Sequence, residues 1–226
     1  MFRFPRLMPL TRGLLIATAV SFVLHAVVQV WVRSPWGLIL ALQTHAASPW
    51  TALQVVTHPL AWRIGPGSPV SLLMQLVFTW WAVSPFEERY GARATAQLLS
   101  FATVAAGVLA ALAGLVSPPD IVAGPGTWML AGWAALGWSL RHATLDFAGL
   151  QVRGVAYLWA ALIMVALSFL TDPRLPTLFA ELAAIGAGVA FVAYRRRRLP
   201  ATRTSSVVSI GAARAARDKK NKEWLN

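Results

Sequence analysis

Six long apolar segments, separated by short runs that hold prolines and charged residues, organise the chain. The segments are 13–32, 70–86, 94–116, 123–140, 154–171 and 175–194. A helix needs about 20 mostly apolar residues to cross a bilayer. Pro69 and Glu87 bound the short second segment, and Arg153 and Asp172 bound the short fifth segment. The pattern predicts an all-α membrane protein with six transmembrane helices.

The first apolar segment has a second interpretation, because Arg3, Arg6 and Arg12 precede it as they would in a secretory signal peptide. The apolar run is longer than the roughly 7–15 residues of a signal-peptide core, and no convincing small-residue cleavage site follows it. We therefore expect an uncleaved membrane helix.

Composition supports the membrane interpretation. Hydrophobic residues make up 57% of the 226 residues and charged residues only 12%, whereas about a quarter of the residues in a soluble globular protein are charged. A net charge of +12 would suggest nucleic-acid binding in a soluble protein. Here half of the basic residues follow Tyr194, so we interpret the excess as an orientation signal and expect no nucleic-acid partner.

The positions of the basic residues predict the orientation. Arg33, Arg63 and Arg174 fall on one side of the predicted membrane, and all other Lys and Arg residues fall on the opposite side. Cytoplasmic segments carry the excess of positive charge. The sequence therefore predicts two cytoplasmic termini, and we expect an integral protein of a bacterial inner (plasma) membrane.

Residues 33–69 form a long predicted outside loop. Trp31, Trp36, Trp50 and Trp62 lie in it or at its edge. Indole rings prefer the membrane–water interface. We expect this first loop to lie partly in the bilayer.

The chain is expected to hold one membrane domain with two flanking segments. Residues 1–12 are the predicted cytoplasmic N-terminus, residues 13–194 the six-helix membrane domain, and residues 195–226 a cytoplasmic tail. The tail is basic and poor in large apolar residues, which is typical of a disordered segment that contacts anionic headgroups.

Metal and cofactor chemistry has little support in the sequence. The absence of cysteine excludes a disulfide and a thiol nucleophile. The four histidines are widely scattered, with no His-x-x-x-His spacing and no carboxylate cluster. We expect neither a metal site nor a cofactor.

Polar, alanine and glycine residues stand at defined positions in three of the apolar segments. The second segment carries Ser71, Gln75 and, at its end, Glu87 and Gly91. The fourth segment carries Gly126, Thr127 and Gly132, and the sixth carries Glu181, Ala184 and Gly188. Together with six spans and a long first loop, this order resembles the rhomboid family of intramembrane serine proteases over residues 13–194. The resemblance implies a six-helix rhomboid-like bundle with a membrane-associated first outside loop.

The resemblance also implies roles for these positions. The nucleophilic serine of the family corresponds to Gly126 or Thr127, depending on a one-residue shift, and its histidine base corresponds to Glu181. The family's oxyanion donors correspond to Ser71 and Gln75. A serine hydroxyl needs an adjacent base, and a carboxylate with an ordinary pKa near 4.3 is a weak base at neutral pH. We therefore expect a pseudoprotease that binds transmembrane helices of client proteins without cleaving them.

Two other functions stay open from the sequence. One is an active intramembrane protease that uses an atypical pair, Thr127 and Glu181. The other is a small transporter or channel with Glu181 as its polar site. Glu181 also has a purely structural interpretation, in which it fills the space of the histidine and bonds Thr127 or an indole N–H group.

The remaining landmarks predict structural roles. Glu87 is expected to cap and anchor the cytoplasmic end of the second helix, four residues before Gly91. Ala184 and Gly188 form a small-xxx-small motif, which lets helices approach closely in lipid. The resemblance implies that they bring the sixth helix to the fourth, where Gly132 provides room.

Overall fold

The computed structural model describes residues 5–34, 38–44, 49–147 and 150–198. In this part of the chain the α-helices are α1 (Pro9–Ala26), α2 (Pro49–Thr57), α3 (Ser68–Tyr90), α4 (Ala92–Gly114), α5 (Gly126–Ser139), α6 (Val155–Thr171) and α7 (Leu175–Arg198). A π-helical turn, η1 (Val27–Trp31), extends α1, and a 3-10 turn, η3 (His58–Leu60), follows α2. The strands are β1 (Leu42–Gln43), β2 (Ile121–Val122), β3 (Thr144–Phe147) and β4 (Leu150–Arg153).

The chain divides into two compact units, Met1–Val192 and Ala193–Asn226. α1 begins at Pro9, before the predicted domain start at residue 13, and α7 continues to Arg198. Residues 199–226 of the predicted tail lie outside the described residues.

Within the described ranges, four helices are long and apolar enough to cross a membrane. They are Pro9–Trp31, Ser68–Tyr90, Ala92–Gly114 and Leu175–Arg197. α6 is apolar but shorter. The protein is therefore a multi-pass helical membrane protein whose exposed apolar faces contact the lipid bilayer.

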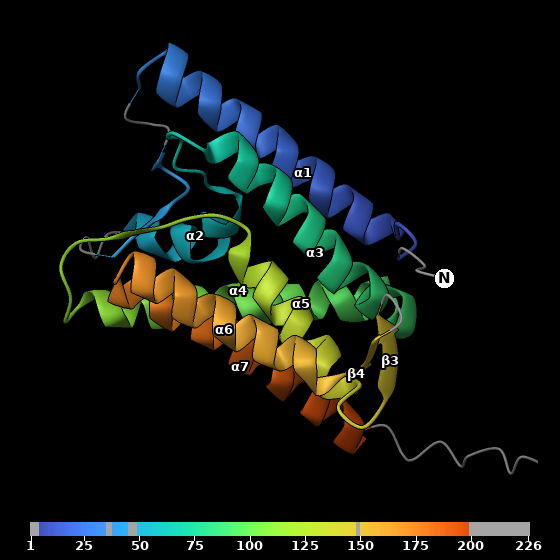
Figure 1. Ribbon diagram of the computed structural model, residues 1–226. Coiled ribbons are helices and arrows are strands. Elements are labelled where there is room, and N and C mark those ends of the chain that lie inside the picture. Colours follow the sequence, from blue (N-terminus) through green and yellow to red (C-terminus); the bar gives the residue numbers. More distant parts are fainter. Residues whose placement is uncertain (1–4, 35–37, 45–48, 148–149, 199–226) are drawn as a thin grey trace, which may run out of the picture. The chain divides into compact units, whose positions relative to one another are not determined.

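The predicted fourth span differs most from expectation. Each of the six apolar segments holds a helix, but α5 has only 14 residues, about 21 Å at 1.5 Å per residue, against a hydrocarbon core of about 30 Å. Nearly all of its residues are buried. A helix that is apolar on all sides is typical of a core position. α5 is the central helix against which α3, α4 and α6 pack (Figure 1).

Small residues bring α7 close to α5. A Cβ atom built at Gly188 would lie 2.5 Å from the carbonyl oxygen of Ala131, so only glycine allows this approach. Ala184, one turn earlier, is fully buried. Gly132 serves a different contact from the one expected, because the atoms nearest to its missing Cβ belong to Ala82 and Val83 of α3. Gly132 thus gives room to α3 rather than to α7.

Glu87 caps a helix, but not its own. Its carboxylate accepts hydrogen bonds from the amides of Leu10 (2.9 Å) and Thr11 (2.8 Å) and from the hydroxyl of Thr11 (2.7 Å), in the first turn of α1. These amides have no partner within the helix. One turn earlier on α3, Ser84 accepts a hydrogen bond from the amide of Met8 at 3.2 Å. The expected cap of α3 is instead a cap of α1, and it ties α1 to α3.

Gly91 forms the turn between α3 and α4. Its φ angle of 81° lies in the left-handed region, which favours glycine. Its amide donates to the carbonyl oxygen of Glu87 at 2.7 Å and closes the end of α3.

The predicted first loop contains α2, which makes polar contacts on one side and has an exposed apolar face. The side chain of Gln54 is buried and bonds the amide of Gln43 and the carbonyl oxygen of Ile39, both at 3.2 Å. Trp50, Leu53 and Val56 are exposed. An exposed apolar face on a short helix is what the predicted membrane contact requires. Trp36 and His45 of this loop lie outside the described residues.

In the residues that the structure describes, two antiparallel pairs of strands lie between the helices. β1 pairs with β2, so the first loop is bound to the segment before α5. β3 and β4 form a hairpin between α5 and α6, a region that the sequence predicts only as a loop.

Candidate functional site

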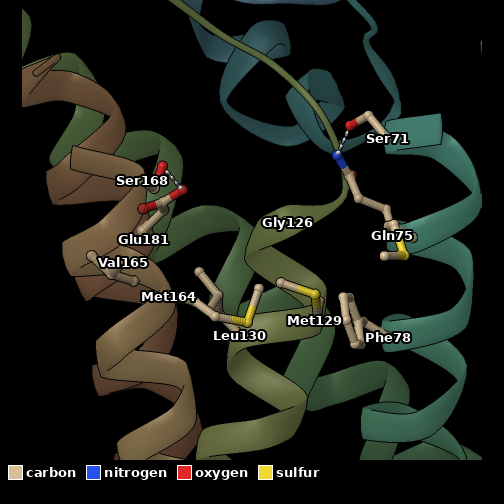
Figure 2. A pocket seen from close by; sticks show the side chains of 11 residues that line it. Ser71, Gln75, Phe78, Gly126, Met129, Leu130, Met164, Val165, Ser168 and Glu181 are labelled. Carbon is tan, nitrogen blue, oxygen red and sulfur yellow. Dashed lines mark hydrogen bonds between the residues drawn. The ribbon is translucent and has the colours of Figure 1, made fainter. Parts of the chain in front are cut away.

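A cavity of about 230 Å³ lies between α3 on one side and α6 and α7 on the other, with α5 beneath it (Figure 2). Its lining residues come from all four helices. They are Ser71, Met74, Gln75 and Phe78 of α3, Gly126, Met129 and Leu130 of α5, Met164, Val165 and Ser168 of α6, and Glu181 of α7.

The α3 wall contributes a polar pair. The Nε2 group of Gln75 donates a hydrogen bond to Oγ of Ser71 at 3.2 Å, one turn away on the same helix. Oε1 of Gln75 is buried and has no hydrogen-bond partner among the described residues. Gly67, with a φ angle of 82°, turns the chain into α3 just before these residues.

The α5 wall distinguishes the two candidate nucleophile positions. Gly126, the first residue of α5, lines the cavity, and a Cβ atom built there would meet nothing within 4 Å. Thr127 is not a lining residue. Its hydroxyl is buried and has no hydrogen-bond partner among the described residues. The cavity therefore receives no hydroxyl from the start of α5.

The opposite wall holds Glu181 beside Ser168. The hydroxyl of Ser168 on α6 donates to Oε1 of Glu181 on α7 at 3.4 Å (Figure 2). The sequence predicts Thr127 or an indole N–H group as the partner of Glu181, whereas the structure shows Ser168. The sequence did not assign Ser168 to the site, because its 13-residue separation from Glu181 hides their proximity across the α6–α7 connection.

An aromatic cluster joins three helices next to the cavity. Trp133 of α5 meets Phe78 and Trp81 of α3 and Tyr157 of α6 edge-on, with ring centroids 5.7, 6.2 and 6.3 Å apart. Trp81 and Tyr157 also meet directly, at 6.4 Å. This cluster connects α3 to α6 through α5. It adjoins the cavity at Phe78, which belongs to both.

A second, more polar hollow adjoins the cavity, and we call it the vestibule. It measures about 310 Å³ and shares Ser71 and Gln75 with the cavity. Its other lining residues include Arg63, Arg174 and Thr177. The two hollows thus meet at the polar pair of α3.

Arg174 is neutralised within the vestibule. It forms ion pairs with Asp120, at 3.3 Å, and with Asp172. Burial alone would lower the pKa of Arg174, but hydrogen bonds to Asp172 and Asp120 outweigh burial and raise it. Thr177 donates a further hydrogen bond to Asp120 at 3.2 Å.

None of the cavity-lining residues is a histidine. His25 bonds the carbonyl oxygen of Ser21 within α1, at 2.7 Å. His58 is fully buried, donates from Nδ1 to the carbonyl oxygen of Val55 (3.0 Å), and accepts the amide of Gly124 on its own carbonyl (3.0 Å). Burial lowers the pKa of His58 to about 4, so the ring is neutral at pH 7. Both rings thus bond carbonyl oxygens within their own chain segments, away from the cavity.

The chemistry available in the cavity is hydrogen bonding in apolar surroundings. The α3 wall offers an amide and a hydroxyl, and the opposite wall offers a hydroxyl and a carboxylate. Methionine, phenylalanine, leucine and valine side chains form the rest of the lining. Within the described part of the chain, no group of three or more His, Cys, Asp or Glu side chains lies together as a metal site would need.

Comparison of the chain with protein-family models finds no match, and comparison with curated proteins finds none either.

Proposed function

We propose that this protein is a rhomboid-like pseudoprotease that binds transmembrane helices of client membrane proteins in the cavity between α3 and α6, without cleaving them. The observation that carries the proposal is the convergence of four positions with family counterparts, Ser71, Gln75, Gly126 and Glu181, on one cavity. These residues lie far apart in the sequence. Their presence around one cavity supports the resemblance to the rhomboid family that their order and spacing indicate.

Exposed apolar side chains lie at the α3 and α6 walls of the cavity, which suits a client helix. Met74 lines the cavity and is 51% exposed on α3. On α6 the neighbouring residues Ile163 and Leu167 are also exposed. An approaching helix would find apolar edges on both sides and a partly polar interior, and helices associate in lipid through close packing and interhelical hydrogen bonds.

The residues of the cavity favour binding over proteolysis. Gly126 has no side chain, and the hydroxyl of Thr127 is buried away from the cavity lining. The atypical Thr127–Glu181 pair therefore lacks the contact that a nucleophile needs with its base. Glu181 accepts its hydrogen bond from Ser168 instead.

The proposal includes an orientation. The positive-inside rule favours cytoplasmic termini in a bacterial inner membrane. The vestibule then faces the outside of the cell, and a client helix enters the cavity from the lipid phase.

Photo-crosslinking tests the proposal. A photoreactive residue at Met74 is expected to capture membrane proteins through their transmembrane segments. The matched control is the same residue at Phe101, which is 50% exposed on α4 but lines no part of the cavity. Equal capture at the two positions would show only collisions in the bilayer and would contradict the proposal.

Labelling with a serine-directed fluorophosphonate tests the absence of catalysis. The protein is expected to stay unlabelled. Labelling that disappears in a Thr127→Ala variant would instead establish the protease alternative.

A further inference from the structure

Glu181 is the one ionisable side chain among the described residues that line the cavity. It lies six residues after the start of α7 at Leu175, about 9 Å along the helix at 1.5 Å per residue. Its hydrogen bond from Ser168 is long, at 3.4 Å. A carboxylate at this depth is expensive unless it meets a partner of opposite charge or a strong donor.

The protein supplies little compensating charge. Arg174 interacts electrostatically with Glu181, but it lines the vestibule rather than the cavity. Its guanidinium group is bound by Asp120 and Asp172. Arg63 also lines the vestibule, so two basic side chains there stand against the two carboxylates that bind Arg174. Among the described residues, no basic side chain lines the cavity beside Glu181.

The facing wall adds a second acceptor. Oε1 of Gln75 is buried and has no partner among the described residues. Gln75 uses one of its two N–H donors on Ser71, and its buried oxygen, an acceptor, is the atom without a partner. The volume of about 230 Å³ far exceeds the roughly 10–15 Å³ that one water requires, which leaves room for the end of a long side chain.

We propose that the cavity selects client helices that carry a basic side chain, Lys or Arg, level with Glu181, and that this side chain pairs with Glu181. The inference rests on the proposed function and names the class of client. Ionisable groups inside membranes pair with one another, and a hydrogen bond to a charged group is stronger than one between neutral groups.

Model helices test the selection. The full-length protein, in nanodiscs of a neutral phosphatidylcholine, is titrated with two synthetic Leu/Ala transmembrane peptides that differ at one position, Lys in one and Met in the other, about 9 Å from the outer end. Binding is measured as photo-crosslinking from position 74. The Lys peptide is expected to bind about tenfold more tightly, the ratio that a charge-assisted hydrogen bond supplies.

Variants assign the preference to Glu181. Glu181→Gln keeps the size and an acceptor for Ser168, and is expected to remove the preference while the Met peptide still binds. Glu88→Gln removes a carboxylate at the exposed far end of α3, outside the cavity, and should keep the preference. Equal binding of the two peptides, or a preference that survives Glu181→Gln, overturns the selection and leaves the proposed function standing. Capture of neither peptide at position 74 overturns both.

Discussion

Glu87 on α3 accepts two hydrogen bonds from Thr11 on α1, one from the backbone amide at 2.8 Å and one from the hydroxyl at 2.7 Å. Both residues are buried, with 1% and 0% of their surface exposed. The contact joins the first turn of one membrane-spanning helix to the last turns of another, 76 residues later in the chain. A carboxylate at a helix N-terminus satisfies unpaired amides and complements the helix dipole.

Removal of this cap should destabilise the protein. Glu87→Ala leaves two amides and a hydroxyl unpaired in a buried place, and we expect a loss of about 2 kcal/mol. Thermal unfolding of the detergent-solubilised protein should show a clearly lower Tm. The exposed neighbour Glu88 provides the control, since Glu88→Ala should leave Tm within the range of a surface change. Equal effects of the two substitutions would mean that the cap contributes nothing.

The packing of α7 on α5 predicts a contrast between two glycines of the same helix. Gly188→Ala places a methyl group 2.5 Å from a backbone oxygen and should cost about 1–3 kcal/mol as overpacking. Gly186→Ala meets nothing within 4 Å and should be neutral or stabilise the helix by about 0.5–1 kcal/mol. Unfolding midpoints of the two variants measure the difference, and identical midpoints would refute the close approach.

Gly126 offers a test of the inactive cavity. Because the space around it is open, Gly126→Ser should fold with an unchanged Tm. The new hydroxyl would enter a cavity whose lining has no histidine, so the variant should remain unlabelled by a fluorophosphonate. Labelling of this variant would show that Glu181 can act as a base, against our account.

His58 makes stability depend on pH. Its pKa is lowered by burial from 6.5 to about 4, so between these values the unfolded chain binds a proton that the folded protein does not. Stability is therefore highest above about pH 6.5 and falls as the pH drops towards 4, by about 3 kcal/mol at most. A pH series of Tm values checks this. His58→Gln should flatten the series, whereas substitution of the exposed His142 should not.

The hydropathy pattern predicts where helices form, because apolar runs between charges and prolines must satisfy their backbone groups internally in lipid. It does not predict that the segment around Gly126 forms a short core helix. That outcome depends on the helices that surround α5. The hydropathy of an apolar segment is the same whether lipid or protein covers it.

Contacts between distant residues account for most of what the sequence left open. The order of Ser71, Gln75, Gly126 and Glu181 suggests one site, and these four residues do line one cavity. The partner of Glu87 could not be read from its own helix, because the donors belong to α1. Ser168 likewise has no local signal, since only the arrangement of α6 and α7 brings it to Glu181.

Identification of the polypeptides captured from position 74 tests the central claim most directly. Mass spectrometry of the crosslinked products should find uncut transmembrane segments, absent from the control at position 101. Capture should be lost when Gly126→Phe fills the open space at the start of α5. Capture that persists with the cavity filled, or captured proteins that end within their transmembrane segments, would contradict a cavity that holds helices without cleaving them.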